Sequence, residues 1–166
     1  RTHSITAEVV VPEGGAEGVL LTHGSRHGGY CLVVEGGHLH YVHNFLSLDR
    51  FTVSSTTPVP AGEHRLRAEI VATGGPDFST GRGSHAFVRL MVDDDVVGEG
   101  ELPWTVPNLY ATTGLSCGYA AYDSVDPDRY LPPFKFTGTL HRVVLDLTGD
   151  VTLHPEAEMT RLMTQQ

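Results

Sequence analysis

Short apolar and β-branched runs recur along the chain up to residue 147, and each is bounded by Gly, Pro or Asp. In several of them, such as residues 64–72, apolar and charged side chains alternate, which is the pattern of a strand with one buried face. Their spacing, with turn residues between them, is typical of antiparallel sheets. The predicted strands are Ile5–Val11, Gly18–Thr22, Tyr30–Glu35, His38–Asn44, Arg50–Ser55, His64–Ala72, Ala86–Val92, Val96–Glu101 and Gly138–Leu147.

No segment before residue 150 keeps a 3.6-residue apolar period over three turns, so the helices of a parallel α/β sheet are missing. The sequence therefore predicts an all-β fold over residues 1–150, either an antiparallel β-sandwich or a barrel. Tight hairpins are expected at Gly36-Gly37 and at Asp93–Asp95. One helix is predicted, Pro155–Gln166, within a tail (residues 151–166) packed on or beside the sandwich.

Two stretches between the predicted strands are long, Thr73–Ser84 and Pro103–Asp128. The second holds one tryptophan and three tyrosines, and large aromatic side chains favour burial. We therefore expect it to pack over the body of the domain.

The 166 residues suit one domain with a substantial core. Acidic residues outnumber basic ones by 20 to 11, and this net charge of −9 argues against a nucleic-acid partner, whose phosphates attract clustered Lys and Arg. No apolar run approaches the roughly 18–20 residues of a membrane-spanning helix, so no membrane association is expected. The chain opens at Arg1 without Met or a signal-peptide pattern, and we expect an internal or C-terminal piece of a larger product.

The two cysteines, Cys31 and Cys117, are too few for a disulfide framework or a zinc knuckle. Cys31 lies in an apolar run, where a thiol behaves as a small hydrophobe. One long-range disulfide and two free thiols both remain open at this point.

Gly114–Gly118 has the G-x-S-x-G pattern around Ser116, and Asp123 or Asp146 and His141 follow in the order of a serine hydrolase. That motif requires a sharp turn from a parallel strand into a helix. No helical pattern follows Ser116, so we expect a plain strand or turn there.

Glu99 and Glu101 would share one face of a strand, with Cα atoms about 6.5–7 Å apart. Their carboxyl groups could then approach the roughly 5–5.5 Å spacing of a retaining glycosidase. The segment that follows, Leu102–Trp104, lacks the third acidic residue usual in sandwich glycosidases, so a solvated face is the default expectation.

The chain has ten histidines, and His38 and His40 would share one face of a strand, with His43 three residues on. Two imidazoles on one face could grip a zinc ion, but a third ligand is missing from the pattern. We expect a polar face here, with Trp104 as a candidate aromatic beside it. We predict no bound metal or cofactor and no catalytic residue in this chain.

Asp123, Asp126 and Asp128 could offer oxygen ligands to calcium, but the spacing is not that of an EF-hand loop. A capped turn is the simpler expectation.

Several stretches, in order along nearly the whole chain, carry a distinctive combination of residues. The most specific is PFKFTGTL at Pro133–Leu140. The others are Ser4–Val9, Pro12–Leu20, Leu39–Phe45, Pro60–His64, Val97–Gly100, Val143–Leu147 and Glu156–Gln166. Together they resemble the C-terminal domain of bacterial, especially actinobacterial, arylsulfatases.

This resemblance implies a jelly-roll sandwich of the concanavalin A-like or laminin-G-like kind, in agreement with the strand pattern. It also implies that the sulfatase chemistry belongs to an upstream α/β domain. That domain would carry a formylglycine, made from the cysteine of a C-x-P-S-R motif, and a bound calcium. Neither cysteine of this chain stands in such a motif, so no catalytic residue is carried over. The chain departs from the family between Ser116 and Asp128, where members are richer in Asp and Gly than the Ala120-Ala121 found here.

Three functions follow as hypotheses. The first is a non-catalytic accessory domain that packs on and stabilises a sulfatase catalytic domain of the same polypeptide. The second is a lectin-like carbohydrate-binding module, using a polar face with His38, His40, His43 and Trp104. The third and most remote is a glycosidase using Glu99 and Glu101.

Overall fold

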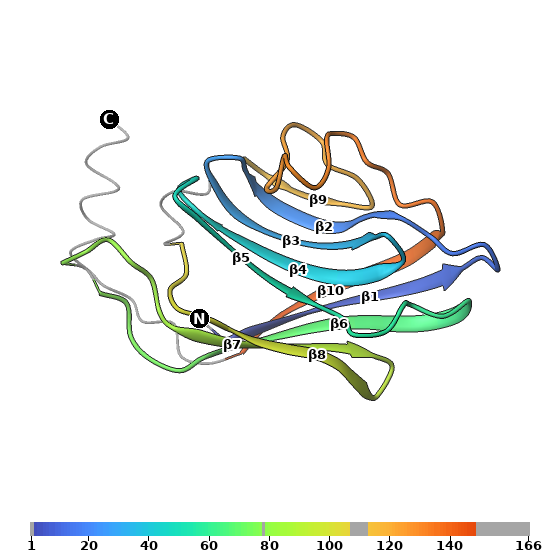
Figure 1. The fold of residues 1–166 in the computed structure, drawn as a ribbon, viewed down its shortest axis with the longest axis horizontal. Helices are drawn as coiled ribbons and strands as arrows, with labels where there is room; N and C mark the ends of the chain where they lie inside the picture. The colour runs from blue at the N-terminus through green and yellow to red at the C-terminus, as the bar shows by residue number, and fades with distance from the viewer. Residues whose placement is uncertain (1, 78, 107–112, 149–166) are drawn as a thin grey trace.

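The structure, a computed structural model, describes residues 2–77, 79–106 and 113–148. All regular elements among these residues are strands (Figure 1). Their bounds are β1 (His3–Val11), β2 (Gly18–Ser25), β3 (Gly28–Glu35), β4 (His38–Phe45), β5 (Asp49–Ser54), β6 (Gly62–Ala72), β7 (Ala86–Val92), β8 (Asp95–Leu102), β9 (Leu115–Cys117) and β10 (Thr139–Leu147).

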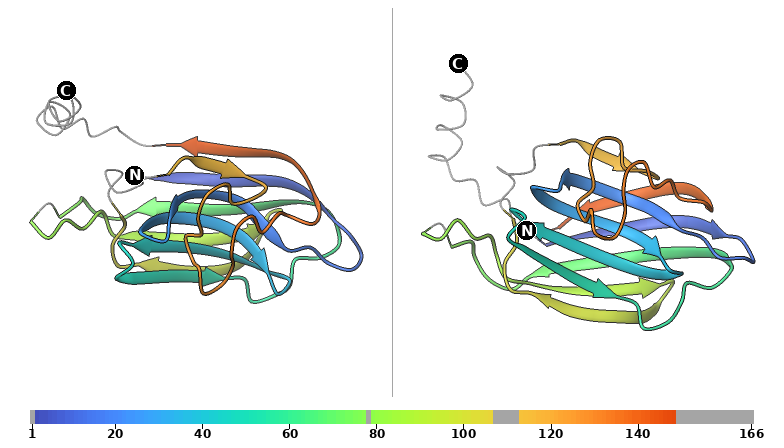
Figure 2. Two further views of the ribbon diagram at one scale, coloured as in Figure 1. Left: turned by 90° about the horizontal axis from the view of Figure 1, so that it is seen from above. Right: turned by 45° about the horizontal axis from the view of Figure 1, so that its top comes forward.

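The strands form two five-stranded antiparallel sheets that stack face to face (Figures 1 and 2). Sheet A has the order β10-β1-β6-β7-β8, and sheet B has the order β5-β4-β3-β2-β9. This arrangement confirms the predicted antiparallel β-sandwich. The predicted helix Pro155–Gln166 and the tail 151–166 lie outside the described residues. None of the described residues forms a helix long and apolar enough to cross a membrane.

All nine predicted strands are present, with small shifts at their ends. The largest shift is in the β2–β3 hairpin, where the strands extend to Ser25 and from Gly28. Glycines here indicated a turn, but they allow two backbones to approach closely: a Cβ on Gly29 would lie 2.1 Å from the carbonyl oxygen of His23. The short strand β9 was not among these nine, although a plain strand or turn was expected around Ser116, which it contains.

The main core lies between the two sheets and follows the two-residue period of the strands. Sheet A contributes the odd-numbered residues of β1 and the even-numbered residues of β6 and β7. The side chains buried most completely include Ile5, Leu66, Leu90, Leu32 and Tyr41.

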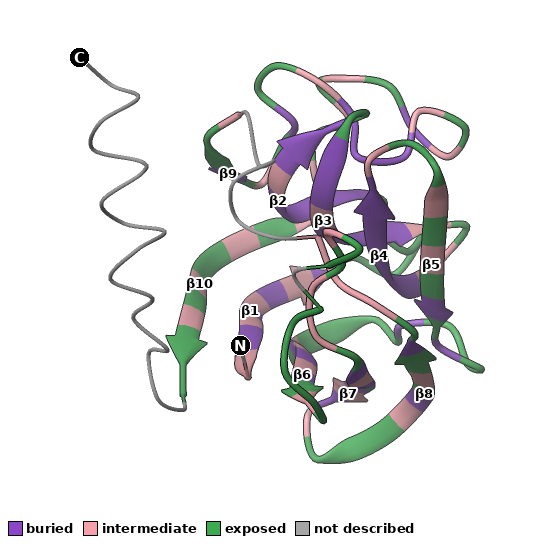
Figure 3. Ribbon diagram, turned by 90° about the vertical axis from the view of Figure 1, so that its left-hand side faces the viewer, coloured by how far each residue is buried: buried purple, intermediate pink, exposed green. Residues whose placement is uncertain are grey.

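Sheet B is buried on its outer face as well. Residues 118–136, which we call the cover segment, lie across that face (Figures 1 and 3). A second apolar cluster joins the two: Val19, Cys31, Val33 and Val42 of the sheet with Ala120, Val125, Tyr130 and Phe134 of the cover segment. The long stretch after Pro103 therefore packs on the body over its described part, as expected.

The cysteines are not joined by a disulfide: Cys31 is buried in this second cluster, whereas Cys117 is exposed. Burial raises the pKa of the Cys31 thiol to about 12, so it stays protonated and acts as a small apolar side chain.

The two sheets meet along one side of the sandwich, where β5 and β8 lie next to each other. The backbone N–H of Thr56, just after β5, donates to the carbonyl of Val97 in β8, with an N···O distance of 2.7 Å. Gly98 permits this closure, because a Cβ there would lie 2.4 Å from the carbonyl oxygen of Ser54.

We expect Gly98→Ala to lower the free energy of unfolding by about 1–3 kcal/mol, because the added methyl group meets backbone that cannot rotate away. Gly114→Ala is the matched control, since nothing lies within 4 Å of its Cβ position, and it should change stability by less than about 1 kcal/mol. Urea denaturation of both variants measures the difference. Equal effects would show that the β5–β8 closure is not tight.

Candidate functional site

His38 and His40 lie side by side on the outer face of β4, with ring centroids 6.4 Å apart. The Nε2–H of His40 donates to the carbonyl of Glu35 at 3.1 Å, and its Nδ1 accepts from the Ser54 hydroxyl at 2.7 Å. Burial lowers the pKa of His40, so the neutral form that fits these two bonds is favoured. Its ring nitrogens are therefore both used within the protein.

His43 is not on this face. It points into the core beside Tyr30 and Tyr41, and its Nε2 accepts the backbone N–H of Val106 at 2.8 Å. Burial lowers its pKa to about 3. His43 thus anchors the segment after β8 to the core as a neutral imidazole.

Trp104 lies apart from both His40 and His43. Its ring meets Phe45 and Phe51 edge-on, and the guanidinium of Arg82 lies 4.0 Å from its centroid. The structure therefore brings together only His38 and His40 of the four residues predicted to form one polar face. Within the described residues, no group of three or more His, Cys, Asp or Glu side chains could hold a metal ion.

Glu99 and Glu101 lie on the outer face of sheet A, and both are exposed. The Nε–H of Arg89 donates to Glu99 at 2.8 Å, and His85 approaches Glu101 at 3.8 Å. Arg89 also reaches Glu69, which binds Arg67, so Glu99 belongs to a row of alternating charges across β6, β7 and β8. This arrangement is that of a solvated, self-neutralised sheet face.

The residues of the serine-hydrolase pattern are dispersed. Ser116 is buried in β9 opposite Thr22, in agreement with the plain strand expected there. Asp123 is bound by the guanidinium and backbone N–H of Arg26, and these bonds lower its pKa to about 2. His141 and Asp146 lie on β10 at the margin of sheet A.

The three aspartates considered as calcium ligands each bind an arginine. Besides Asp123, Asp126 is buried and pairs with Arg50, and Asp128 binds the same guanidinium at 2.7 Å. Arg129 lies between Asp126 (3.4 Å) and Glu35 (2.8 Å). These ion pairs fasten the cover segment to sheet B. No local pattern in the sequence indicates these pairs, because the partners lie far apart along the chain.

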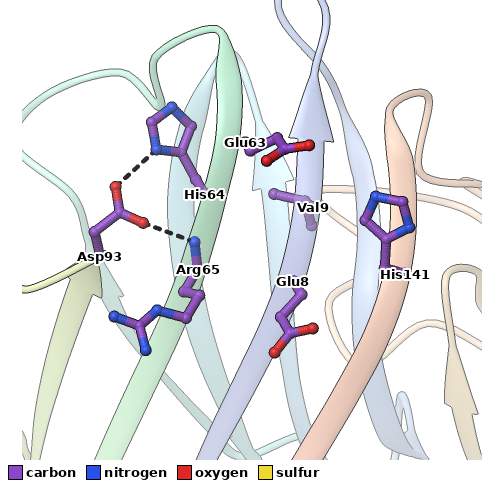
Figure 4. A pocket seen from close by; sticks show the side chains of 7 residues that line it. All are labelled: Glu8, Val9, Glu63, His64, Arg65, Asp93 and His141. Carbon is purple, nitrogen blue, oxygen red and sulfur yellow. Dashed lines mark hydrogen bonds and ion pairs between the residues drawn. The ribbon is translucent and has the colours of Figure 1, made fainter.

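A hollow in the described surface lies at one end of sheet A (Figure 4). It is shallow, about 340 Å³, and open to solvent. Its lining residues come from β1, β6, the β7–β8 turn and β10: Glu8, Val9, Glu63, His64, Arg65, Asp93 and His141.

His64 is the central group of this hollow. Its Nδ1–H donates to Asp93 at 2.8 Å and its Nε2–H donates to the Ala61 carbonyl at 3.2 Å. The bond to Asp93 raises the pKa of His64, because two acceptors favour the doubly protonated ring. Asp93 also accepts the backbone N–H of Arg65, so this pair ties the β7–β8 turn to β6. Within this hollow, His64 and Asp93 are therefore already hydrogen-bonded to each other and to the backbone. The sequence predicts the acidic turn but not its pairing with His64.

Compared with known proteins, the chain matches no family model and no curated sequence.

The buried state of His43 predicts a loss of stability in acid. Its pKa of about 3 in the folded protein lies below the roughly 6.5 of an unfolded chain, so the unfolded state binds more protons between these values. From this group the free energy of unfolding should fall by up to about 1.4 kcal/mol per pH unit as pH drops below 6.5. In His43→Gln, whose amide oxygen can accept the Val106 N–H, denaturation curves at several pH values should show a shallower decline. His27→Gln, at an exposed position, should keep the wild-type slope; an unchanged slope in His43→Gln would contradict the assignment.

The ion pairs of the cover segment predict a second effect. Arg50→Met should lower the free energy of unfolding by about 2 kcal/mol, because it leaves buried Asp126 with only the longer contact to Arg129. The figure is below that of a fully buried pair, since the side chain of Arg50 is 32% exposed. Arg65→Met removes the exposed pair with Asp94 and should cost less than about 1 kcal/mol. Thermal and urea denaturation of both variants test this, and a larger loss in Arg65→Met would refute the ranking.

Proposed function

We propose that this chain is a non-catalytic accessory domain of an arylsulfatase, which packs on a catalytic domain of the same polypeptide and stabilises it. The observation that carries the proposal is the outer face of sheet A. Among the described residues nothing covers this face, whereas the outer face of sheet B lies beneath the cover segment (Figure 3).

The outer face of sheet A has the character of a protein-binding surface. Val71, Val96 and Val144 are 44%, 50% and 41% exposed on it, so apolar side chains stand among its charged residues. The charged residues between them are paired with each other, so a partner domain can cover them without leaving a charge alone. The resemblance of the sequence to sulfatase C-terminal domains supports a catalytic domain as that partner.

The formylglycine and calcium of such an enzyme would belong to the partner domain. The acidic residues of the cover segment do not suit a cation, because Asp123, Asp126 and Asp128 are held by arginines. Lectin-like carbohydrate binding is a second candidate. It is favoured by Tyr122, which is 77% exposed on the cover segment and offers a ring on which a sugar could stack.

We expect the purified chain to hydrolyse neither 4-nitrophenyl sulfate nor 4-nitrophenyl glycosides, and Glu99→Gln and Ser116→Ala to give the same baseline. Calorimetric titration with a panel of polysaccharides should give no heat of binding. Turnover that is lost on denaturation or in Glu99→Gln would overturn the non-catalytic assignment. Binding heat that disappears in Tyr122→Ala would make the carbohydrate-binding candidate the better one.

If the outer face of sheet A docks on a catalytic domain, a charge introduced on that face should have different effects in the isolated chain and in the complete enzyme. Val71→Lys should leave the melting temperature of the chain nearly unchanged, because the residue points to solvent there. In the complete polypeptide it should lower the melting temperature, since a charge would be buried against the partner domain. Leu48→Lys is the control, because Leu48 is 75% exposed in the β4–β5 turn of sheet B. Equal effects of Val71→Lys in both proteins would contradict docking through sheet A.

A further inference from the structure

Strand β10 is the outermost strand of sheet A. It pairs with β1 along one edge, and among the described residues it forms no ladder along the other edge. All nine residues of β10 are exposed or half-buried, as Figure 3 shows by the absence of purple along it. The outer side of an edge strand presents backbone N–H and C=O groups with which another strand can pair.

The remaining sheet edges of the described chain are closed or short. β5 and β8 meet through the hydrogen bond from Thr56 to Val97 and the close approach at Gly98. β9 has only three residues. β10, by contrast, contains neither Pro nor Lys, the residues that commonly block an edge.

The side chains of β10 follow a self-complementary order. Val143 and Leu145 point inward and pack on the core. Arg142, Val144 and Asp146 point outward, so that a positive, an apolar and a negative residue follow one another. If a second β10 strand runs antiparallel to the first, this order places the positive residue of each strand opposite the negative residue of the other.

We propose that β10 pairs with β10 of a second copy of this chain, antiparallel and centred on Val144, so that two five-stranded A sheets become one continuous sheet. In this register Arg142 lies opposite the partner subunit's Asp146, and the reciprocal pair forms across the two-fold axis. Val144 faces the partner subunit's Val144, and Val143 faces the partner subunit's Leu145. Opposite residues in such a ladder have Cα atoms about 4.5–5.5 Å apart, close enough for each pair to make contact.

Other registers fit less well. A shift by one residue would bring inward side chains opposite outward ones, which the core contacts of Val143 and Leu145 forbid. A shift by two residues, centred on Val143, places Arg142 opposite the partner subunit's Val144 and loses both ion pairs. Arg142 also binds Glu8 of its own chain, and its guanidinium has enough N–H groups to hold both carboxylates.

The dimer does not rest on the proposed accessory function, because it uses the edge of sheet A and extends the outer face sideways without covering it. In the dimer β10 is no longer an edge strand but an internal strand of the continuous sheet. Since the new contact is a single strand pair, we expect a concentration-dependent equilibrium between monomer and dimer rather than a permanent dimer.

The test is sedimentation velocity of the whole chain over a wide concentration range, with two charge variants. Asp146→Arg places arginines opposite each other in its own dimer, and Arg142→Asp does the same with aspartates. Each variant alone should dimerise about tenfold more weakly than the wild type. An equimolar mixture should restore dimerisation, because every pair in the mixed dimer is again an arginine with an aspartate.

Val71→Lys is the control, because Val71 is exposed on the same sheet face but on the internal strand β6. It should dimerise as the wild type does, and thermal melts should show that all variants are folded. A wild type that stays monomeric throughout, or charge variants that dimerise unchanged, would overturn the proposal. Loss of the dimer in Val71→Lys would also overturn it and indicate face-to-face association. None of these results tests the docking of a catalytic domain, which is tested by the melting temperature of the complete polypeptide.

Discussion

The contact between sheet B and the cover segment determines which surfaces of this protein remain available. Apolar residues on the outer face of the sheet, such as Val33 and Val42, would be exposed without Val125 and Tyr130 above them. The same contact brings Asp126 and Arg129 against Arg50 and Glu35, so that ion pairs surround the apolar cluster. Because sheet B is buried on both faces, it does not offer a broad binding face, and the polar residues on it stabilise the packing of the cover segment.

The open surface is therefore that of sheet A, and it combines two properties. Its face carries exposed valines among charges that are already paired, which suits contact with another folded domain. Its margin at β10 has no ladder partner on one side among the described residues, and its side chains follow a self-complementary order. The proposed docking on the face and the proposed dimer through the edge can occur at the same time.

The fold could be predicted from the sequence because it depends on local patterns. Alternation in residues such as Leu66, Ala68 and Ile70 indicates strands, and it also indicates which side faces the core. The candidate site could be predicted less well, because it depends on contacts between distant residues. The alternation that puts His38 and His40 on one face also puts His43 with Tyr41 in the core, so the polar face predicted to include His43 was wrong on a local point. The partners of Asp123 and Asp126 are Arg26 and Arg50, which lie 97 and 76 residues away in the sequence, and no local pattern shows these pairs.

The most direct test of the accessory-domain proposal is to sequence the reading frame immediately upstream of the codon for Arg1. The proposal predicts that this frame continues for several hundred codons and encodes a C-x-P-S-R-type motif within an α/β catalytic domain. A start codon shortly before Arg1, or an upstream domain without such a motif, would contradict it and leave a β-sandwich that acts without a sulfatase partner.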